Sequence, residues 1–402
     1  MRTWRMTFNP KKQKNSVFCQ YFLTNTTDAR RMYNTANFYI RNTMTGIKKS
    51  PELRTPNEVE VLHDVFTGIQ KANKARNIKY QKDLEKYNKG LSEKQSKEPK
   101  YFPYPTTKEW FLTYNVLDAV FKYTHNEVYY SMNSQLNQNA IRKAAAAWKG
   151  YFKTLKDYRK NPSKYKERPN MPGYLKNPQY VAWFSNQTAK YSVEKDGRAY
   201  LRFVHNETLF CIGKASLYTG LRYVKTEIKP QHGCYLILVT FDDGEELPKA
   251  PEKPKRIIGI DPGVDNLAAV VNNFGVHSFL IRGGAVKAAN QWFNKKRASL
   301  LSAVTAGLDS LHSVRNSHSL SALSRKRDDL FRDIFYRAAW YICRFDVRHH
   351  ADVIVIGHNK DQKQEISLGK QNNQSFVSIP FVRFEQILTN TAAKCGIPVI
   401  VQ

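Results

Sequence analysis

A single carboxylate, Asp261, stands at a position in the sequence where it could bind a metal ion. The apolar residues 257–260 predict a buried strand that ends at this aspartate, and residues 267–271 predict a second strand. An acid at the end of a rigid strand, open to solvent, suits a metal ligand. The dipeptide Pro262-Gly263 that follows is also typical of a hairpin turn. The segment alone leaves a metal site and a purely structural turn open.

Three more acids, Asp328, Asp329 and Asp333, lie within one predicted helix and are candidate metal ligands by residue type. Arg332 and Arg337 stand four residues after Asp328 and Asp333, at the spacing that joins side chains on one helix face. We therefore interpret these acids as members of ordinary helix ion pairs rather than as metal ligands.

The five cysteines are scattered along the chain and form no CxxC pair. They are Cys19, Cys211, Cys234, Cys343 and Cys395. This pattern predicts neither a zinc site nor a disulfide framework, and it agrees with a reducing compartment. No apolar run approaches the ~18 residues of a membrane span, and the first residues lack the apolar centre of a signal peptide. We expect a cytoplasmic protein without a membrane partner.

The net charge is the strongest compositional signal. The chain of 402 residues carries 64 Lys and Arg against 34 Asp and Glu, a formal charge of +30. That excess is larger than solubility requires, and a polyanion that releases counterions on binding is its natural partner. The 23 Tyr, 22 Phe and 6 Trp add rings on which bases could stack. The composition predicts a folded nucleic-acid-binding protein; a basic surface without a specific partner is the alternative.

Cations concentrate on one predicted helix and on the segment after it. Apolar residues from Ile141 to Tyr158 recur at helical spacing, and cations fill the other faces. Residues 160–178 contain four prolines and many cations, which predicts an extended basic connector. A solvated helix face and a phosphate-binding face both agree with this pattern. The predicted nucleic-acid-binding residues are Arg142, Lys143, Lys149, Lys153, Lys156, Arg159, Lys160, Lys164, Lys166 and Arg168.

The elements around this helix alternate in type along the chain. Residues 16–23 predict a short strand, Asp28 is a candidate helix cap, and Thr107 opens a further helical run. Alternating apolar residues predict later strands at 200–204, 221–228 and 235–241. Because the first strand has no sheet of its own, we expect it to join these strands, so that the helical block is an insertion. Residues 242–255 predict a linker.

The last part of the chain predicts an α/β domain. The two strands around Asp261 are followed by a third at 276–281. A helix at 325–348 comes next, with Leu330, Ile334, Ala338, Tyr341, Ile342 and Phe345 on its inner face. A strand at 352–356, a helix at 380–395 and a final strand at 397–401 complete the pattern. A three-strand meander followed by helices and further strands is the order of a ribonuclease-H-like core.

Three segments are similar to the TnpB family, the transposon-encoded RNA-guided nucleases ancestral to type V CRISPR effectors. The first two resemble its RuvC-like half and the third resembles its helix and connector. They are RIIGIDPGVDNLAAVV, DVIVIGHNKDQKQEISLGKQNNQSFVSIPF and AAAAWKGYFKTLKDYRKNPSKYKERPNMPGYL. The resemblance is nearly chain-long, and it implies guide RNA and double-stranded target DNA as partners.

The resemblance also implies an α+β multidomain fold. A β wedge domain, oligonucleotide-binding-like, would take its first strand from residues 1–25 and the remainder from 177–250. Residues 26–176 would form the inserted helical recognition domain with the basic connector. Residues 251–402 would form a RuvC-like, ribonuclease-H-like domain that lacks its C-terminal part. The basic helix and connector would then grip guide RNA and the RNA–DNA heteroduplex through their backbones.

The catalytic pattern of the family is only partly present. Asp261 matches the first metal ligand, but Gly357 stands where a second ligand, a Glu, is common. Glu365 occupies the place of an acid that some relatives carry further along. Gln362 and Tyr336 replace an aromatic residue and a His that are usual in the family. The resemblance therefore implies that Asp261 and Glu365 are remnants of a catalytic site, with weak Mg²⁺ binding or none.

In the family, the last strand leads into a CxxC…CxxC zinc ribbon and a third catalytic Asp, whereas this sequence ends at Gln402. We therefore expect no zinc and an incomplete two-metal centre. The favoured function is that of the nuclease-dead relatives called TldR, which bind target DNA through a guide RNA and repress transcription. A TnpB nuclease whose C-terminal catalytic segment is missing from this chain is the alternative. A DNA-binding protein without RNA is a third possible function, although no helix-turn-helix or finger signature is present.

We expect a monomer associated with the bacterial nucleoid.

Overall fold

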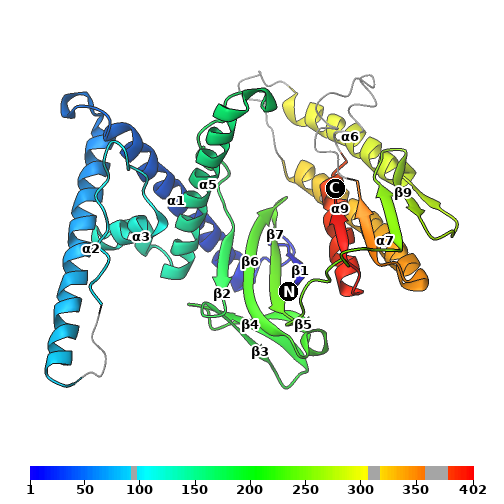
Figure 1. The fold of residues 1–402 in the computed structure, drawn as a ribbon, viewed down its shortest axis with the longest axis horizontal. Coiled ribbons are helices and arrows are strands. Elements are labelled where there is room, and N and C mark those ends of the chain that lie inside the picture. The colour runs from blue at the N-terminus through cyan, green and yellow to red at the C-terminus, as the bar shows by residue number, and fades with distance from the viewer. Residues whose placement is uncertain (92–96, 307–316, 358–378) are drawn as a thin grey trace. The chain divides into compact units, whose positions relative to one another are not determined.

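The computed structural model describes residues 1–91, 97–306, 317–357 and 379–402 (Figure 1). The chain divides into two compact units, Met1–Gly244 and Glu245–Gln402, within the predicted linker 242–255. The predicted mixture of helices and sheets in more than one domain is confirmed. None of the described helices is long and apolar enough to cross a membrane.

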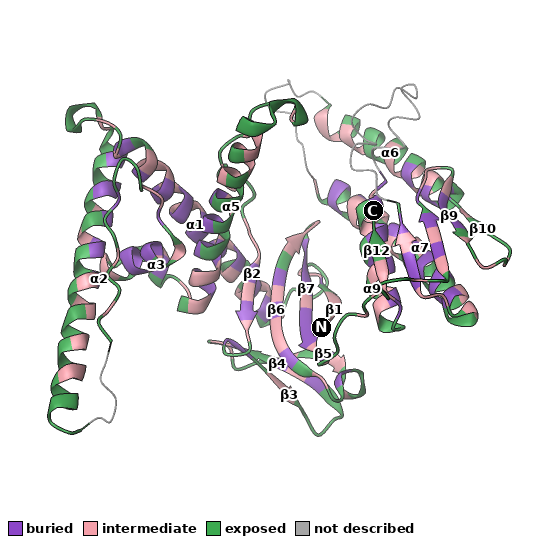
Figure 2. Ribbon diagram, viewed as in Figure 1, coloured by how far each residue is buried: buried purple, intermediate pink, exposed green. Residues whose placement is uncertain are grey.

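Helices form one part of the first unit. α1 (Val17–Gly46), α2 (Pro56–Asn88), α3 (Tyr114–Tyr123) and α5 (Ser134–Lys160) share an apolar core, and the short α4 (Glu127–Tyr130) lies between the last two in the chain. A capping box starts α2: Thr55 Oγ1 accepts from Glu58 N at 3.4 Å, and Glu58 Oε2 accepts from Thr55 N at 2.9 Å. The side chains of Ile40, Val65 and Trp148 are fully buried in the core. The far half of α2 is mostly exposed (Figure 2).

Two antiparallel sheets form the other part of the first unit. One has the order β1 (Arg2–Phe8), β7 (Cys234–Asp242), β6 (Arg222–Gln231) and β2 (Ala182–Ser185). The other contains β3 (Ala189–Val193), β4 (Arg198–Phe203) and β5 (Leu209–Lys214). β1 pairs with β7 from Arg2 opposite Phe241 to Phe8 opposite Tyr235. The first strand therefore joins later strands, and the helices lie between β1 and β2 in the chain.

The predicted strand at 16–23 is wrong, because these residues begin α1. Ser16 caps the helix by accepting from Phe18 N at 3.3 Å. Phe18 and Phe22, four residues apart, are both buried, with ring centroids 5.6 Å apart. That spacing places both rings on one helix face, but it also fits one face of a strand, so these two residues alone could not decide between the two elements. Asp28 is an interior residue of α1 rather than its cap.

The helix expected to open at Thr107 begins later, at Tyr114, with Thr113 as its cap. Before it, Thr106 Oγ1 accepts from Glu109 N at 3.0 Å and closes a local turn. A threonine hydroxyl can stabilise a turn as well as a helix start, which explains the misplaced boundary.

The second unit contains a five-stranded mixed sheet. Its order is β10 (Phe279–Arg282), β9 (Asn266–Asn272), β8 (Ile257–Asp261), β11 (Val353–Ile356) and β12 (Val399–Val401). β8, β9 and β10 form an antiparallel meander, while β11 runs parallel to both β8 and β12. The helices of this unit are α6 (Gly284–Thr305), α7 (His318–His349) and α9 (Phe381–Lys394). The predicted meander, last helix and last strand are all present.

Helix α7 differs from its prediction in two ways. It starts at His318, where Ser317 Oγ accepts from Leu320 N at 3.2 Å, rather than at residue 325. Of the predicted inner face, Ala338 and Ile342 are buried, whereas Leu330 and Tyr341 are 37% and 55% exposed. The buried rings on this helix are instead Phe331 and Phe335. Apolar residues occur on more than one face of α7, so periodicity alone could not fix its rotation.

Candidate nucleic-acid interface

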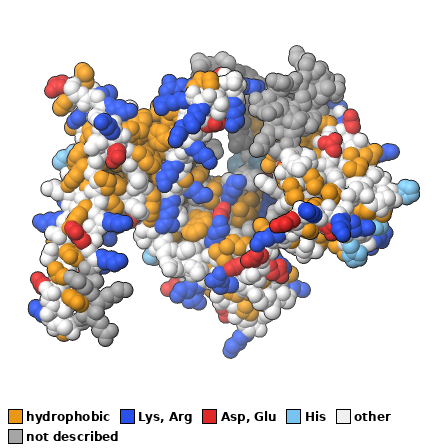
Figure 3. Space-filling model, viewed as in Figure 1, with side chains coloured by type: hydrophobic (Ala, Val, Ile, Leu, Met, Phe, Trp, Pro, Cys, Tyr) orange, Lys and Arg blue, Asp and Glu red, His pale blue; other side chains and the backbone are white. Residues whose placement is uncertain are grey.

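All ten predicted cations are exposed. Those from Arg142 to Lys160 lie on α5, and Lys164, Lys166 and Arg168 lie in the connector that follows. Lys and Arg side chains gather over α5 in the space-filling view (Figure 3). Exposure is what phosphate binding requires; the binding itself stays a prediction.

Five cations form a stripe along α5, which we call the α5 stripe. Its members are Arg142, Lys149, Lys153, Lys156 and Lys160. Successive spacings of seven, four, three and four residues keep side chains on one helix face. With a rise of 1.5 Å per residue, the stripe is roughly 27 Å long. Because the buried Trp148 side chain anchors another face of the helix, the stripe is held toward solvent.

Two of the ten cations are already engaged. The Arg142 guanidinium lies over the Tyr114 ring, 4.5 Å from its centroid, and Nη2 donates to the phenol oxygen at 3.2 Å. Lys164 Nζ lies 3.1 Å from Asp157 Oδ2. Hydrogen bonds from Tyr165, Lys164 and Asn161 lower the pKa of Asp157 to about 2. These contacts orient Arg142 and fix the start of the connector at the end of α5.

A row of α1 side chains holds the connector backbone. Each donates to a carbonyl oxygen there: Arg30 Nε to Leu175 at 3.1 Å, Asn34 Nδ2 to Leu175 at 3.2 Å, Asn37 Nδ2 to Gly173 at 3.1 Å, and Arg41 Nη2 to Pro172 at 2.6 Å. In return, Leu175 N donates to Asn34 Oδ1 at 2.8 Å. The predicted connector is therefore extended yet fixed, apart from the short 3-10 turn Pro162–Lys164.

Sequence reasoning missed this row. The signal was present as polar residues at positions 30, 34, 37 and 41, which recur at helical spacing. Such residues usually face solvent, so they did not stand out. Here they satisfy carbonyl groups of a segment that has no sheet or helix partner.

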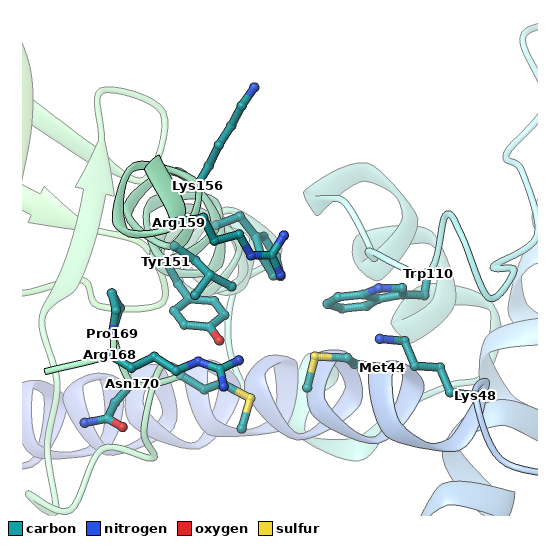
Figure 4. A pocket seen from close by; sticks show the side chains of 12 residues that line it. Met44, Lys48, Trp110, Tyr151, Lys156, Arg159, Arg168, Pro169 and Asn170 are labelled. Atoms are coloured by element: carbon teal, nitrogen blue, oxygen red, sulfur yellow. The ribbon is translucent and has the colours of Figure 1, made fainter. Parts of the chain in front are cut away.

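A groove of ≈ 880 Å³ opens between the end of α1, α5 and the connector (Figure 4). We call it the Trp110 groove. Its lining includes Met44, Lys48, Trp110, Tyr151, Arg159 and Arg168. In Figure 4, Trp110 stands on one side, and Arg159 and Arg168 extend toward the opening from the other. None of the twelve lining residues is acidic. The groove brings rings and cations together from segments far apart in the sequence.

Asp261, the predicted metal ligand, ends β8 and is exposed. Gly357 follows β11, the parallel neighbour of β8, and its N–H donates to Ile260 O at 2.9 Å. A Cβ atom at position 357 would lie 4.0 Å from Asp261 Oδ1. The position is thus directly beside Asp261, and glycine supplies no carboxylate there.

The remaining predicted site residues do not add a metal site to the described structure. Glu365 and Gln362 lie outside the described residues. Within the described part of the chain, no group of three or more His, Cys, Asp or Glu side chains could hold a metal ion. Tyr336 lies on α7 and is 48% exposed.

The three acids on α7 form ion pairs, as expected. Arg337 pairs with Asp333 at 2.5 Å, at the predicted spacing of four residues. Arg332 pairs with Asp329 at 3.0 Å, three residues away. Asp328 lies 3.8 Å from Arg383 on α9. The interpretation of these acids as members of ion pairs is confirmed.

No protein-family model and no curated protein matches this sequence. Among the solved structures that resemble this chain are two at 12% identity. A cryo-EM structure of a Cas12f1–sgRNA–target DNA complex has a TM-score of 0.41, covering 84% of this chain and 72% of that chain. A cryo-EM structure of a CRISPR-Cas12f ternary complex has a TM-score of 0.29, covering 99% and 88%. At these TM-scores the similarity decides neither the fold nor the function.

Proposed function

We propose that this protein is an RNA-guided DNA-binding protein without nuclease activity. It binds a guide RNA and a complementary DNA beside a short flanking motif, and represses transcription by occupying that DNA. The observation that carries the proposal is the α5 stripe, which continues into a basic connector fixed on α1. A rigid row of cations can follow a nucleic-acid backbone without reading its sequence.

The charge distribution supports guide-directed rather than protein-directed specificity. Lys and Arg contacts to phosphates position a duplex but carry no sequence information. Specificity must then come from elsewhere, and base pairing with a guide RNA supplies it. The formal charge of +30 suits an RNA that stays bound while DNA is sampled.

The fold supports the same proposal. We propose that the meander β10-β9-β8, continued by the parallel strands β11 and β12, is a RuvC-like domain of the ribonuclease-H type. The sheets containing β1 to β7 would be the wedge domain. The inserted helices would be the recognition domain, because they interrupt the chain between β1 and β2.

The surroundings of Asp261 support the absence of cleavage. A two-metal nuclease holds its ions between carboxylates from neighbouring strands, so that the attacking and leaving oxygens are both stabilised. Position 357, directly after β11 and beside Asp261, is where a second carboxylate could share an ion with it, and that residue is glycine. The described residues therefore do not fit a two-Mg²⁺ centre.

The second candidate is an RNA-guided DNA endonuclease of the TnpB kind. Asp261 favours it, because an exposed carboxylate at a strand end is retained where a metal ligand would stand. Glu365, which lies outside the described residues, would supply a second acid.

One experiment separates the two candidates. The protein is purified with its RNA, the RNA is sequenced, and a duplex that matches the guide is offered with Mg²⁺. The proposal expects a retarded and intact duplex, with no retardation of a scrambled duplex. Mg²⁺-dependent cleavage that disappears in Asp261→Ala would establish the nuclease instead.

A further inference from the structure

The Trp110 groove has the features of a binding site for one nucleotide. Its volume of ≈ 880 Å³ lies within the range of about 300–1,000 Å³ that is usual for small-molecule sites. It opens beside the α5 stripe, since Lys156 belongs to both. A nucleic acid on the stripe therefore passes the mouth of the groove.

The Trp110 ring makes T-shaped contacts with its aromatic neighbours. Phe111, Trp148 and Phe152 meet it at interplanar angles of 85°, 82° and 74°. This packing fixes the orientation of the ring. Lys48 Nζ lies over the ring, 5.6 Å from its centroid. A fixed indole with a cation above it is suited to a nucleobase that brings its phosphate along.

The cations of the groove lie where a phosphate would need them. In Figure 4, Arg159 and Arg168 extend toward Trp110 from the opposite side, and the Tyr151 ring lies between the two arginines. Arginine presents a planar fork of donors that matches phosphate oxygens. With no acidic lining residue, the groove repels cationic and favours anionic ligands.

We propose that the Trp110 groove takes one unpaired nucleotide, with its base against Trp110 and its phosphate against Arg159 and Arg168. The inference rests on the proposed function, because the nucleotide belongs to a strand bound along the α5 stripe. It deepens that function by assigning a place where the strand leaves the duplex form. Stacking is tolerant of sequence, so the groove accepts any base.

Photocrosslinking tests the assignment directly. The complex is formed with guide RNA carrying 5-iodouridine at single positions and, in a second series, with target DNA carrying 5-iododeoxyuridine. Irradiation is followed by mapping of the attached peptides. The proposal predicts that one labelled position, in the RNA or in a DNA strand, attaches to Trp110 or Tyr151. A full scan of all strands in an intact complex without such an attachment overturns it.

Affinity and its salt dependence provide the second test. Trp110→Leu is expected to weaken binding of the strand that crosslinks by roughly tenfold, with an unchanged slope of log K against log salt. Arg168→Gln is expected to reduce that slope by about one. Trp110→Phe, which keeps a ring, should restore most of the affinity and shows that the loss is not misfolding. The matched controls Tyr104→Leu and Lys195→Gln replace exposed residues outside the groove and should change neither quantity.

The outcomes distinguish this inference from the proposed function. If the unaltered protein binds guide RNA and target DNA but Trp110→Leu binds them equally well, the inference is wrong and the proposed function stands. If the unaltered protein binds no RNA, both are wrong.

Discussion

Trp148 on α5 donates its indole N–H to Asn37 Oδ1 on α1 at 2.8 Å, and both side chains are fully buried. The amide nitrogen of the same Asn37 donates to the connector at Pro172 O and Gly173 O, at 3.3 and 3.1 Å. One asparagine thus joins the basic helix, the first helix and the connector. The bond fixes the direction of the α5 stripe relative to the connector.

Trp148→Phe should destabilise the helical part of the first unit. The ring is kept in part, but Asn37 Oδ1 loses its donor while it stays buried, which costs about 1–3 kcal/mol. A lower midpoint of thermal unfolding and weaker RNA binding are expected. Trp340→Phe is the control, because Trp340 is 55% exposed on α7. Equal midpoints for the two variants would show that the buried bond contributes nothing.

Neutralising the α5 stripe should weaken nucleic-acid binding without changing its specificity. In the triple variant Lys149→Gln, Lys153→Gln, Lys156→Gln, each lost phosphate contact lowers the salt slope by about one. Duplexes of different sequence, each offered to protein that carries the matching guide, should lose affinity by the same factor. The control replaces the exposed Lys195, Lys229 and Lys253 by Gln. If the salt slope of binding is the same in both triple variants, the nucleic acid does not bind along the α5 stripe.

Gly357→Glu should create a divalent-metal site beside Asp261. The backbone of Gly357 needs no positive φ, and a Cβ there meets its neighbours at ordinary contact distances of 3.7 and 4.0 Å. Two adjacent carboxylates attract a cation that one exposed carboxylate holds only weakly. Mn²⁺ titration followed by electron paramagnetic resonance should show affinity at least tenfold above that of the unaltered protein. Adding Asp261→Ala should remove the gain; a gain that persists in the double variant would mean that Asp261 takes no part.

Asp346 should make the second unit less stable as the pH rises. It is buried on α7, and within the described structure Oδ2 has no hydrogen-bond partner. Burial raises its pKa from 3.8 to about 6, although the nearby His350 opposes the shift. The folded state therefore holds the proton more tightly, and stability falls between about pH 4 and pH 6 and is constant above.

Asp346→Asn removes this ionisation and should stabilise the protein at pH 7.5 by up to about 3 kcal/mol. Thermal unfolding of both proteins at pH 4.5 and pH 7.5 measures the effect. The difference between them should be much smaller at pH 4.5. Asp352→Asn is the comparison variant, for which the opposite change in stability at pH 7.5 is expected. Hydrogen bonds from the Arg256 and Lys255 backbone lower the pKa of Asp352, so its charged form stabilises the folded state. A pH-independent gain for Asp346→Asn would contradict the buried-acid account.

The parts of the fold that rest on strong local patterns could be predicted from the sequence. β7 and β8 are continuous apolar strands, and α5 has a clear apolar side. β1 was missed although Trp4, Met6 and Phe8 alternate along it, because the basic residues around it masked the pattern. Aromatic residues at 18 and 22 gave a false strand, since aromatic residues favour strands and residues four apart share a face in a strand as well as in a helix.

The candidate site was predictable only in its charges. The exposure of the cations on α5 follows from the apolar side of that helix. The Trp110 groove does not follow from any local pattern, because Met44, Trp110, Tyr151 and Arg168 come together only when α1, α5 and the connector pack. The position of Gly357 beside Asp261 required the parallel pairing of β8 with β11, which no local sequence signal specifies.

The central claim is that the protein binds matching DNA through RNA and leaves it uncut. The most direct test incubates the RNA-bound protein and Mg²⁺ with a duplex that contains the guide-matched sequence at varied flanking motifs, and follows binding and strand integrity in one gel. The account predicts RNA-dependent retardation of full-length DNA beside one flanking motif. DNA cut at a fixed position, in reactions where Asp261→Ala leaves it intact, would contradict the account.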